Sequence, residues 1–360
     1  MITNSVIIVG QLEAGIGRHV KNYCEYVDPS AQIYTDLRHS DKQLIKELRL
    51  IGVNIKNLSV VKKPSILDLK NLYTLIKTLR KKEVDIVIGH GAKGGIYARC
   101  LRVLKCCKRA YYVPHGGVLH YNFNTFLGVV YLSIEKILYY FTYKILFESS
   151  YSKLNYFQKV KKIKQCRYEM LHSCIEMEKI RIDYNRDNEK LKLCCVAQLR
   201  QLKGIDLLLK ALTEAKLPLN SYICDIYGGG TPEETQHYKK YVVEAGLEEV
   251  IKFRGVQDVF SVYCEYDLYI QPSRFESFGL AALEAYYAGC DLLLSNTGGL
   301  LENFKGADDV VYFENGSFKS LKEAIEDYAP NPVRKSRKDF FKNYTPGRFK
   351  ETYIAALQHE

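Results

Sequence analysis

The feature that most constrains the fold of this chain is a regular alternation of short apolar runs with segments of helical spacing. In the first half, runs of strand length lie at 5–10, 31–37, 54–60, 85–90, 110–115 and 144–150. Segments with an apolar face at helical spacing separate them, as at 68–82 and 94–104. In the second half, strands are expected at 192–199, 221–227, 250–256, 267–272, 291–296 and 310–313. This alternation predicts an α/β chain with doubly wound parallel sheets.

The length of 360 residues fits two domains of ordinary size. A polar, lysine-rich and weakly patterned stretch separates the two halves. We therefore expect a Rossmann-like N-terminal domain over 1–165, a linker over 166–190 and a second Rossmann-like domain over 191–335, the two facing a cleft. The remaining 336–360 is expected to be a helical segment, for which packing against the N-terminal domain is one option.

Several protein classes are excluded by composition. The longest apolar stretch, 126–147, carries Glu135 and Lys136 near its middle, so no membrane-spanning helix is expected. The N-terminus lacks a basic region and leads directly into a strand, which disfavours export. The eleven cysteines are odd in number and show no C-x-x-C spacing. We expect a cytoplasmic protein without disulfides and without a metal site.

The charge is unevenly divided along the chain. Residues 1–180 contain 29 Lys and Arg against 14 Asp and Glu, whereas the remainder contains 23 against 27. Two clusters without acidic residues, 99–109 and 151–168, flank an aromatic-rich stretch at 121–143. An anionic membrane surface would attract this half. Alternatively, the basic residues only maintain solubility and the aromatic stretch packs on the sheet. No nucleic-acid motif accompanies the charge, so nucleic acid is not an expected partner.

The most informative stretch is 272–280, PSRFESFGL, which leaves an apolar strand and opens a helix that continues to about Ala288. Ligands bind at the carboxyl ends of strands in such sheets. A helix N-terminus offers unpaired N–H groups and a positive dipole end to a phosphate. Gly279 would let the ligand approach the backbone closely. The alternative is that Ser277 caps the helix and Gly279 serves packing.

Glu284 is the only charged residue between Ser277 and Cys290. Its neighbours at helical spacing include no cationic partner, and a buried unpaired carboxylate is costly. Ribose hydroxyls would satisfy it. Glu276 lies just outside the helix start, so both carboxylates could border one crevice on either side of a phosphate. The alternative is a solvated Glu284, with Glu276 compensating the helix dipole.

The spacing Glu276-x7-Glu284 resembles the E-x7-E signature of retaining GT-B glycosyltransferases of family 4, also called group 1. Other segments resemble motifs of that family in order and spacing: 15–20 (GIGRHV), 85–99 (DIVIGHGAKGGIYAR), 112–116 (YVPHG), 198–204 (QLRQLKG), 226–230 (IYGGG), 253–256 (FRGV) and 295–302 (SNTGGLLE). The resemblance spans roughly 6–327 and is most specific from 194 to 302. It implies a GT-B fold.

The resemblance implies roles for the residues that match its motifs. Glu276 would contact the hydroxyls of the donor sugar, and Glu284 would contact the ribose. Lys203 would neutralise the charge that develops on the leaving nucleoside diphosphate. The diphosphate itself would be held by the backbone N–H groups of Phe278, Gly279 and Leu280.

The resemblance also implies roles for residues farther from this helix. Arg254 and Val256 would lie near the base. Gly15 and Gly17 would let the opposite domain close onto the phosphates, and His115 would lie beside the reacting sugar carbon. For His115, as for His90, the alternative is a hydrogen-bonded structural histidine.

Two positions depart from the family pattern. Gln198 stands where the family usually has arginine, and glutamine can donate a hydrogen bond but brings no charge. Arg200, Arg18 and Arg274 are the cations that could replace it, and Gln198 and Arg200 are both expected at the donor site. The stretch 172–176, HSCIE, replaces the family's usual N-G-I-D turn.

The resemblance implies a retaining, metal-independent glycosyltransferase without a cofactor, whose co-substrate is a nucleotide sugar. Family frequency favours uridine over guanosine as the base. The resemblance implies a glycan or lipid-linked acceptor at the cytoplasmic leaflet of a bacterium. Two alternatives are a GT-B-fold sugar-nucleotide epimerase or phosphorylase and a degenerate sugar-nucleotide-binding subunit. A nicotinamide dehydrogenase is disfavoured, because 15–20 lacks the final glycine of G-x-G-x-x-G, and no P-loop motif exists.

Overall fold

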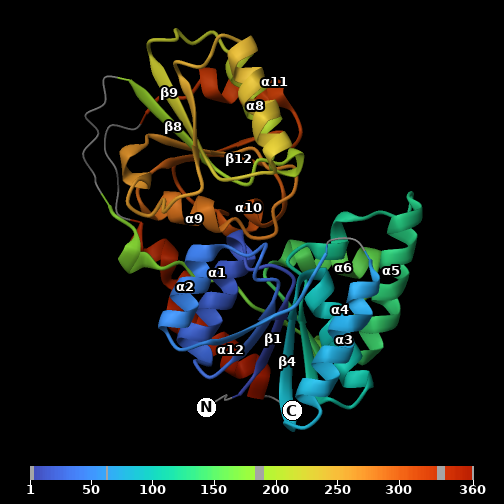
Figure 1. Ribbon diagram of the computed structural model, residues 1–360. Helices are drawn as coiled ribbons and strands as arrows, with labels where there is room; N and C mark the ends of the chain where they lie inside the picture. The colour runs from blue at the N-terminus through green and yellow to red at the C-terminus, as the bar shows by residue number, and fades with distance from the viewer. Residues whose placement is uncertain (1–3, 62–63, 183–189, 331–336, 359–360) are drawn as a thin grey trace. The chain divides into compact units, whose positions relative to one another are not determined.

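The computed structural model describes residues 4–61, 64–182, 190–330 and 337–358. The chain divides into two compact units (Figure 1). Unit 1 comprises Met1–Cys174 together with Pro346–Glu360, and unit 2 comprises Ile175–Thr345. Parts of the expected linker 166–190 and of the expected C-terminal segment 336–360 lie outside the described residues.

Unit 1 is built on a parallel sheet with the strand order β3-β2-β1-β4-β5-β6-β7. Its strands are β1 (Val6–Val9), β2 (Gln32–Thr35), β3 (Asn54–Asn57), β4 (Val84–His90), β5 (Cys107–Val113), β6 (Lys144–Phe147) and β7 (Tyr168–Met170). The central strand β1 is buried along its whole length. Because crossover helices cover both faces of such a sheet, the strands are nearly continuous apolar runs.

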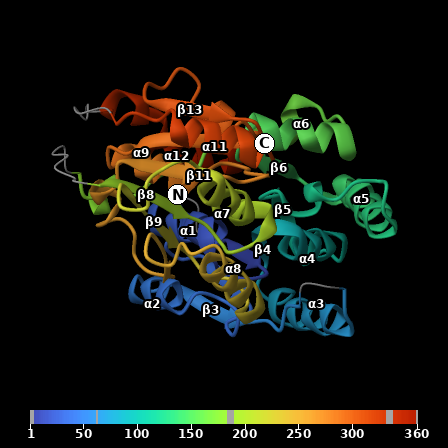
Figure 2. The same cartoon turned by 90° about the horizontal axis from the view of Figure 1, so that it is seen from above.

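The helices of unit 1 are α1 (Ala14–Asn22), α2 (Lys42–Leu50), α3 (Ile66–Leu79), α4 (Gly91–Val103), α5 (Phe126–Leu138), α6 (Ser150–Lys159) and α12 (Pro346–Gln358). Polar side chains begin several of them. Asp41 caps α2, Ser65 forms a capping box at α3, and Thr125 and Ser149 cap α5 and α6. Helices α3 and α4 lie side by side in both views (Figures 1 and 2).

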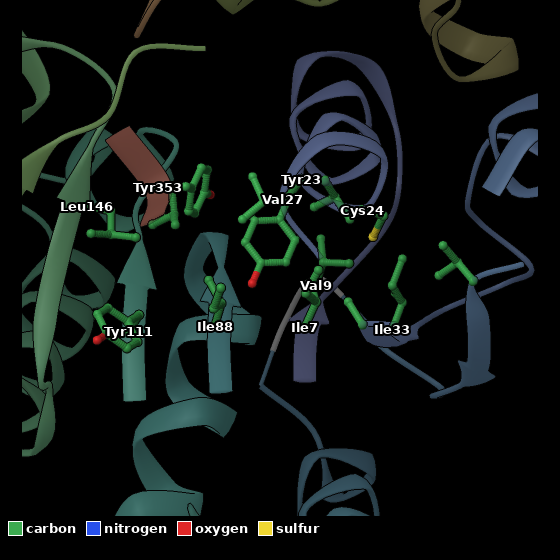
Figure 3. Close-up of a cluster of buried hydrophobic side chains, with 14 of the residues drawn as sticks. Ile7, Val9, Tyr23, Cys24, Val27, Ile33, Ile88, Tyr111, Leu146 and Tyr353 are labelled. Atoms are coloured by element: carbon green, nitrogen blue, oxygen red, sulfur yellow. The ribbon is translucent and has the colours of Figure 1, made fainter. Parts of the chain in front are cut away.

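The last helix of the chain contributes to the core of unit 1. Phe349, Tyr353, Ala356 and Leu357 of α12 are buried with residues of the first strands and helix. Figure 3 shows Tyr353 near Tyr23 and Leu146 in this cluster. The ring centroids of Tyr353 and Tyr23 lie 4.8 Å apart. Residues 346–358 therefore pack within the same core as the first 174 residues.

Unit 2 contains a parallel sheet with the order β10-β9-β8-β11-β12-β13. Its strands are β8 (Leu191–Val196), β9 (Tyr222–Tyr227), β10 (Ile251–Gly255), β11 (Leu268–Gln271), β12 (Asp291–Ser295) and β13 (Val310–Phe313). Its helices are α7 (Ile205–Glu214), α8 (Pro232–Glu244), α9 (Leu280–Tyr287), α10 (Gly298–Asn303) and α11 (Phe318–Glu326). Both sheets have the strand reversal of a doubly wound fold, next to their central strands.

The predicted α/β class with two doubly wound sheets is confirmed. Each of the twelve strands expected from the sequence has a counterpart, whereas β7 was not expected. It has three residues and lies within the polar stretch assigned to the linker, pairing with β6 at the sheet edge. An edge strand this short has little apolar pattern to reveal it. No helix in the described residues has the length and apolar character required to cross a bilayer.

Candidate functional site

Helix α9 begins directly after the loop that follows strand β11. Its N-cap is Gly279, with φ of +92°, and a Cβ at this position would lie 2.6 Å from Cδ2 of Leu300. Only glycine fits this conformation and this spacing without strain. No side-chain hydrogen bond caps the helix, so the alternative in which Ser277 serves as the cap is wrong. A helix N-terminus without a side-chain cap has backbone N–H groups that can bind an anion.

The following helix, α10, holds this loop in place. The N–H of Gly299 donates to the carbonyl oxygen of Glu276 at 2.9 Å, and Nδ2 of Asn303 donates to the carbonyl of Phe278 at 2.6 Å. A Cβ on Gly299 would lie 2.4 Å from the carbonyl oxygen of Ser277. The two segments can therefore approach this closely only because residue 299 is glycine. These contacts explain why a G-G motif accompanies the 272–280 loop.

Lys203 and Glu276 form an ion pair beside the start of α9. Nζ of Lys203 donates to Oε2 of Glu276 at 2.7 Å, and the two side chains are 24% and 14% exposed. Lys203 is followed by Gly204, whose Cβ, if present, would lie 1.8 Å from the carbonyl oxygen of Pro272. The glycine therefore lets the segment 201–204, which we call the lysine loop, pack against the loop that carries Glu276. Sequence analysis predicted both charged residues at the site, and the structure brings them together.

A buried polar network lies behind Glu276. Gln271 donates from Nε2 to Oε2 of Glu276 at 3.3 Å and to Oγ of Ser273 at 2.9 Å. The Ser273 hydroxyl donates to the same carboxylate oxygen at 3.4 Å, and the hydroxyl of Tyr269 donates to Oε1 of Gln271. Gln271, Ser273 and Tyr269 are all buried. With Lys203, three donors thus converge on Oε2, which fixes the orientation of the carboxylate.

Arg274, one of the three cations considered as a replacement at Gln198, has a structural partner. Its guanidinium binds Asp206 in a bidentate manner, with N–O distances of 2.7 and 2.6 Å, and also donates to the carbonyl of Gln201. The hydrogen bonds to Asp206 raise the pKa of Arg274. Arg274 therefore connects the 272–280 loop to the lysine loop and to the start of α7 through hydrogen bonds. Gln198 and Arg200 lie partly buried in the segment after β8.

Arg254, near the end of strand β10, is held by a buried carboxylate on the neighbouring strand β9. Its Nε and Nη2 donate to Asp225 at 2.8 and 3.2 Å. Asp225 also accepts from the hydroxyl of Tyr266 at 2.6 Å, and that hydroxyl contacts the hydroxyl of Tyr227 at 2.6 Å. The guanidinium is about half exposed while its partner is buried, and Val256 beyond it is 72% exposed. The arrangement presents Arg254 at the surface in a fixed orientation.

Glu284 is 2% exposed, and Oε2 accepts from the hydroxyl of Tyr263 at 3.3 Å. The alternative of a solvated Glu284 is therefore wrong. The helix that carries it is otherwise almost entirely apolar. A buried carboxylate costs free energy unless it accepts hydrogen bonds, so its position needs donors.

In unit 1, three histidines meet around Glu148. His115 has a positive φ of +48°, and its Nδ1 lies 2.8 Å from Oε1 of Glu148. Its Nε2 lies 2.9 Å from Nδ1 of His90. An ionised carboxylate accepts hydrogen bonds and cannot donate them, so Glu148 favours the hydrogen on Nδ1 of His115, which donates to Oε1.

His19, on helix α1, completes this cluster. Its Nδ1 lies 2.7 Å from Oγ of Ser173 and 3.6 Å from Oε1 of Glu148. Its Nε2 lies 2.7 Å from the hydroxyl of Tyr353. We call His19, His90, His115 and Glu148 the histidine cluster. It joins the carboxyl ends of three strands to the first and last helices of the chain.

Burial and mutual repulsion determine the protonation of this cluster. Burial, followed by repulsion from His115, lowers the pKa of His19 to about 3, although the charge of Glu148 opposes the shift. The same causes lower the pKa of His90 well below its ordinary value. Burial alone would raise the pKa of Glu148, but attraction to His115 and His19 lowers it overall. Glu148 is therefore anionic at neutral pH, and His19 and His90 are neutral.

The two predicted glycines of unit 1 lie on the first turn of α1. Gly15 is exposed and Gly17 is buried. A Cβ on Gly17 would lie 2.4 Å from Cδ2 of Leu44 on α2. Packing between α1 and α2 thus supplies a structural reason for glycine at 17.

Sequence reasoning missed several side chains of these clusters, including Glu148, Gln271 and Asp225. Glu148 follows strand β6 and Gln271 ends strand β11, as His90 ends β4, whereas Asp225 lies within β9. Polar residues at the carboxyl ends of parallel strands are the signal that could have found Glu148 and Gln271. Among the described residues, no three His, Cys, Asp or Glu side chains are grouped as ligands for a metal ion.

Part of this chain matches a known protein family, and longer parts match individual proteins. The family described as glycosyl transferases group 1 matches residues 176–345. The O-antigen biosynthesis glycosyltransferase WbnH of Escherichia coli is 28% identical over 288 residues, covering 77% of this chain and 79% of that protein. An uncharacterised 41.2 kDa protein in the cps region of Klebsiella pneumoniae is 24% identical over 92% of this chain and 96% of its own length.

Solved structures agree with the fold. The crystal structure of Anabaena Alr3699/HepE in complex with UDP and glucose matches with a TM-score of 0.79, covering 98% of this chain and 99% of that one. The sequences are only 14% identical, so this likeness concerns the fold.

Proposed function

From the membership of residues 176–345 in the glycosyl transferases group 1 family, and from the GT-B fold of the chain, we propose that this protein is a retaining glycosyltransferase that needs no metal. Its donor is a nucleotide sugar, with UDP as the carrier and a hexose or N-acetylhexosamine as the sugar. Its acceptor is a glycan or lipid-linked glycan in bacterial surface polysaccharide synthesis. The relative named for O-antigen biosynthesis and the one from a cps region support this acceptor class.

The observation that carries the proposal is the Lys203–Glu276 pair beside the uncapped N-terminus of α9. The helix N–H groups at Phe278, Gly279 and Leu280 bind the diphosphate. When the bond between the anomeric carbon and the phosphate oxygen breaks, its electron pair passes to the diphosphate. Lys203 stabilises the charge that develops there, which is the largest kind of catalytic contribution from a fixed side chain.

The carboxylates orient the donor. Because Lys203, Gln271 and Ser273 all bind Oε2 of Glu276, its Oε1 is the oxygen that accepts from the sugar hydroxyls. Glu284 accepts from the ribose, and Arg254 with Val256 borders the base. The bidentate bond to Asp225 holds Arg254 in one orientation, which lowers the entropy lost on binding.

Unit 1 supplies the acceptor side. His115 acts beside the reacting sugar carbon, with its ring orientation fixed by Glu148. The excess of basic residues in the first half fits a peripheral position at the anionic inner face of the membrane, in the cytoplasm.

A thermal-shift screen of UDP-, GDP- and ADP-sugars tests the donor assignment. A ligand that binds only the folded state stabilises it by RT ln(1 + [L]/Kd), so the true donor should raise Tm above the others. If no nucleotide sugar changes Tm, the proposal is wrong. Transfer should persist in EDTA, and loss of transfer in EDTA would contradict metal independence.

The second candidate function is a degenerate subunit that binds the nucleotide sugar without turnover, favoured by the uncharged Gln198. Sugar-nucleotide hydrolysis or transfer by the wild type and by Glu276→Ala separates the two. Turnover that disappears in the variant supports the enzyme. Binding without turnover in the wild type supports the subunit, and a product that is an epimer or a sugar phosphate supports the GT-B epimerase or phosphorylase.

A further inference from the structure

Helix α5 has one face that packs on unit 1 and an opposite face of exposed apolar side chains. The buried face is formed by Gly128, Leu132, Glu135 and Leu138 at helical spacing. The opposite face carries Phe126, which is 82% exposed, and Leu127, Ile134 and Ile137, which are 54%, 38% and 61% exposed. Surface helices of globular proteins normally place charged or polar residues on this face.

Further exposed apolar side chains precede and follow the helix in the sequence. We call the large exposed apolar side chains of 121–141 the α5 patch: Tyr121, Phe123, Phe126, Leu127, Val129, Ile134, Ile137, Tyr140 and Phe141. Helix α5 lies at the edge of unit 1, beyond α4, in both views (Figures 1 and 2). Exposed apolar side chains clustered in this way are typical of a protein or membrane interaction site. The aromatic stretch therefore does not simply pack on the sheet.

The charges around the patch have a single sign. Residues 99–168 contain thirteen Lys and Arg and only two acids, Glu135 and Glu148. Both acids are buried and bound internally, Glu135 by Arg99 at 2.5 and 3.0 Å and Glu148 by His115. No acidic side chain of this segment therefore faces solvent.

Basic side chains border the aromatic ones. Nζ of Lys136 lies 4.7 Å from the ring centroid of Phe123, and Nζ of Lys161 lies 4.5 Å from that of Tyr140. Lys162 and Lys164 are exposed beside Lys161. The patch thus has an apolar centre with a cationic border.

We propose that the α5 patch inserts into the surface of an anionic lipid bilayer, with helix α5 parallel to the membrane. The apolar side chains enter the acyl boundary, and the lysines lie at the level of the lipid phosphates. Two copies of this face would repel each other through their like charges, which favours lipid over self-association. The inference deepens the proposed function and rests on it for the membrane-linked acceptor.

The chain contains no tryptophan, so Phe126→Trp introduces a single fluorescent reporter at the most exposed position of the patch. We expect its emission to shift to the blue with vesicles of phosphatidylcholine containing about a third phosphatidylglycerol, and to be quenched by brominated acyl chains. Leu50→Trp is the matched control, because Leu50 is 77% exposed on α2 and lies outside the patch. Its emission should not change.

Loss variants measure the two contributions in vesicle sedimentation. Phe126→Ser with Ile137→Ser should weaken binding at least about tenfold through lost apolar burial. Lys162→Ala and Lys164→Ala should each weaken it about fivefold, an effect that added salt should diminish. Leu50→Ser with Leu219→Ser, at 77% and 53% exposure, is the control that should bind normally. Thermal melting verifies that each variant is folded.

Three outcomes would overturn the inference. They are an emission spectrum that vesicles do not change, equal binding to pure phosphatidylcholine, and a blue shift that depends on protein concentration without lipid, which would assign the face to a second copy. Donor-induced thermal shifts are recorded without vesicles. Failure of donor binding therefore concerns the donor assignment, and failure of vesicle binding concerns the α5 patch and the proposed membrane position.

Discussion

The two units place polar side chains at the same point of their sheets but with different chemistry. Both clusters lie where parallel strands end, next to the strand reversal. In unit 2, the central pair is Lys203–Glu276, which is partly exposed. In unit 1, the histidine cluster is buried. Of the eight histidines in the sequence, only His237 belongs to unit 2.

This difference suggests a division of tasks. A partly exposed ion pair can exchange one partner for a charged ligand. A buried cluster that is bonded internally depends on one protonation state, and the free energy of unfolding decreases when that state changes. We therefore expect mutations in unit 1 to act mainly on stability and those around Lys203 to act mainly on turnover.

Glu148→Ala should cause the largest loss of stability in unit 1. It removes the buried carboxylate beside Nδ1 of His115 and Nδ1 of His19, and leaving a buried hydrogen-bonding group without its partner costs about 1–3 kcal/mol. The free energy of unfolding from urea titrations measures this loss. Glu169→Ala is the control, because Glu169 is 37% exposed and pairs with Lys144 at 3.4 Å, so its removal should cost at most about 1 kcal/mol. Equal losses in both variants would remove the distinction between buried and exposed pairs.

Lys203→Ala should reduce turnover about 10²- to 10³-fold, because it removes the fixed charge that faces the leaving diphosphate. Folding should change little, since the lysine pairs at a partly exposed site. Initial rates and thermal melting measure the two effects separately. Lys240→Ala, an exposed lysine paired with Glu244 on α8, should leave both unchanged. A Lys203→Ala variant that lost stability but kept its kcat would contradict the proposed role.

Acidification should destabilise unit 1 before unit 2. His19 and His90 have folded pKa values below the ordinary 6.5, to about 3 for His19. As the pH falls below 6.5, the unfolded chain therefore binds protons that the folded chain does not. Stability is complete above 6.5 and decreases below it, by about 2 kcal/mol for the two histidines between pH 6.5 and 5.5. The lowered pKa of Glu148 matters only below its ordinary value of 4.5.

Hydrogen exchange at graded pH measures this loss unit by unit. Amides of β4 and β5 should lose protection below pH 6.5, while those of β8 and β11 should not. His19→Asn with His90→Asn should flatten the pH dependence. Uniform loss of protection in both sheets would show that the histidine cluster does not determine the acid response.

The sequence predicted the fold well because its signal is local. Each buried strand of a parallel sheet is an apolar run, and turn residues separate the runs from the helices. Strand β7 escaped prediction because three residues at a sheet edge carry almost no periodicity. The alternative in which Ser277 caps α9 could not be rejected from the sequence, since residues two positions apart at a loop end differ only in backbone angles that the sequence does not specify.

The candidate site was predictable only in part. The matching motifs indicated Lys203 and Glu276, and their contact follows from the packing of Gly204 on Pro272. The hydrogen bonds from Gln271 and Ser273 that orient Glu276 were not predictable. In the sequence, Gln271 is only the last residue of an apolar strand, and its side-chain partners are known only from the structure. Glu148 was missed for the same reason. Which polar residues meet depends on strand order, which one sequence does not specify.

Gln271→Leu should have the smallest effect and distinguishes support of Glu276 from packing. Leucine fills a similar volume but cannot donate to Oε2, so the carboxylate loses one of its three donors while Lys203 and Ser273 remain. The hydroxyl of Tyr269 keeps a contact at 3.4 Å with the carbonyl of Val196, which limits the loss of stability. We expect kcat to fall about tenfold, the worth of one hydrogen bond to a charged group, with little change in the donor KM.

The control for this substitution is Gln257→Leu, since Gln257 is exposed and donates only to the carbonyl of Arg254 among the described contacts. Gln271→Glu gives the opposite test. A second carboxylate beside Glu276 would repel its charge and raise its pKa. If the reaction requires ionised Glu276, the activity of Gln271→Glu should therefore decrease at a higher pH than that of Gln271→Leu as the pH is lowered. If Gln271→Leu instead raised KM and left kcat intact, the network would hold the ground state of the donor rather than position Glu276 for the reaction.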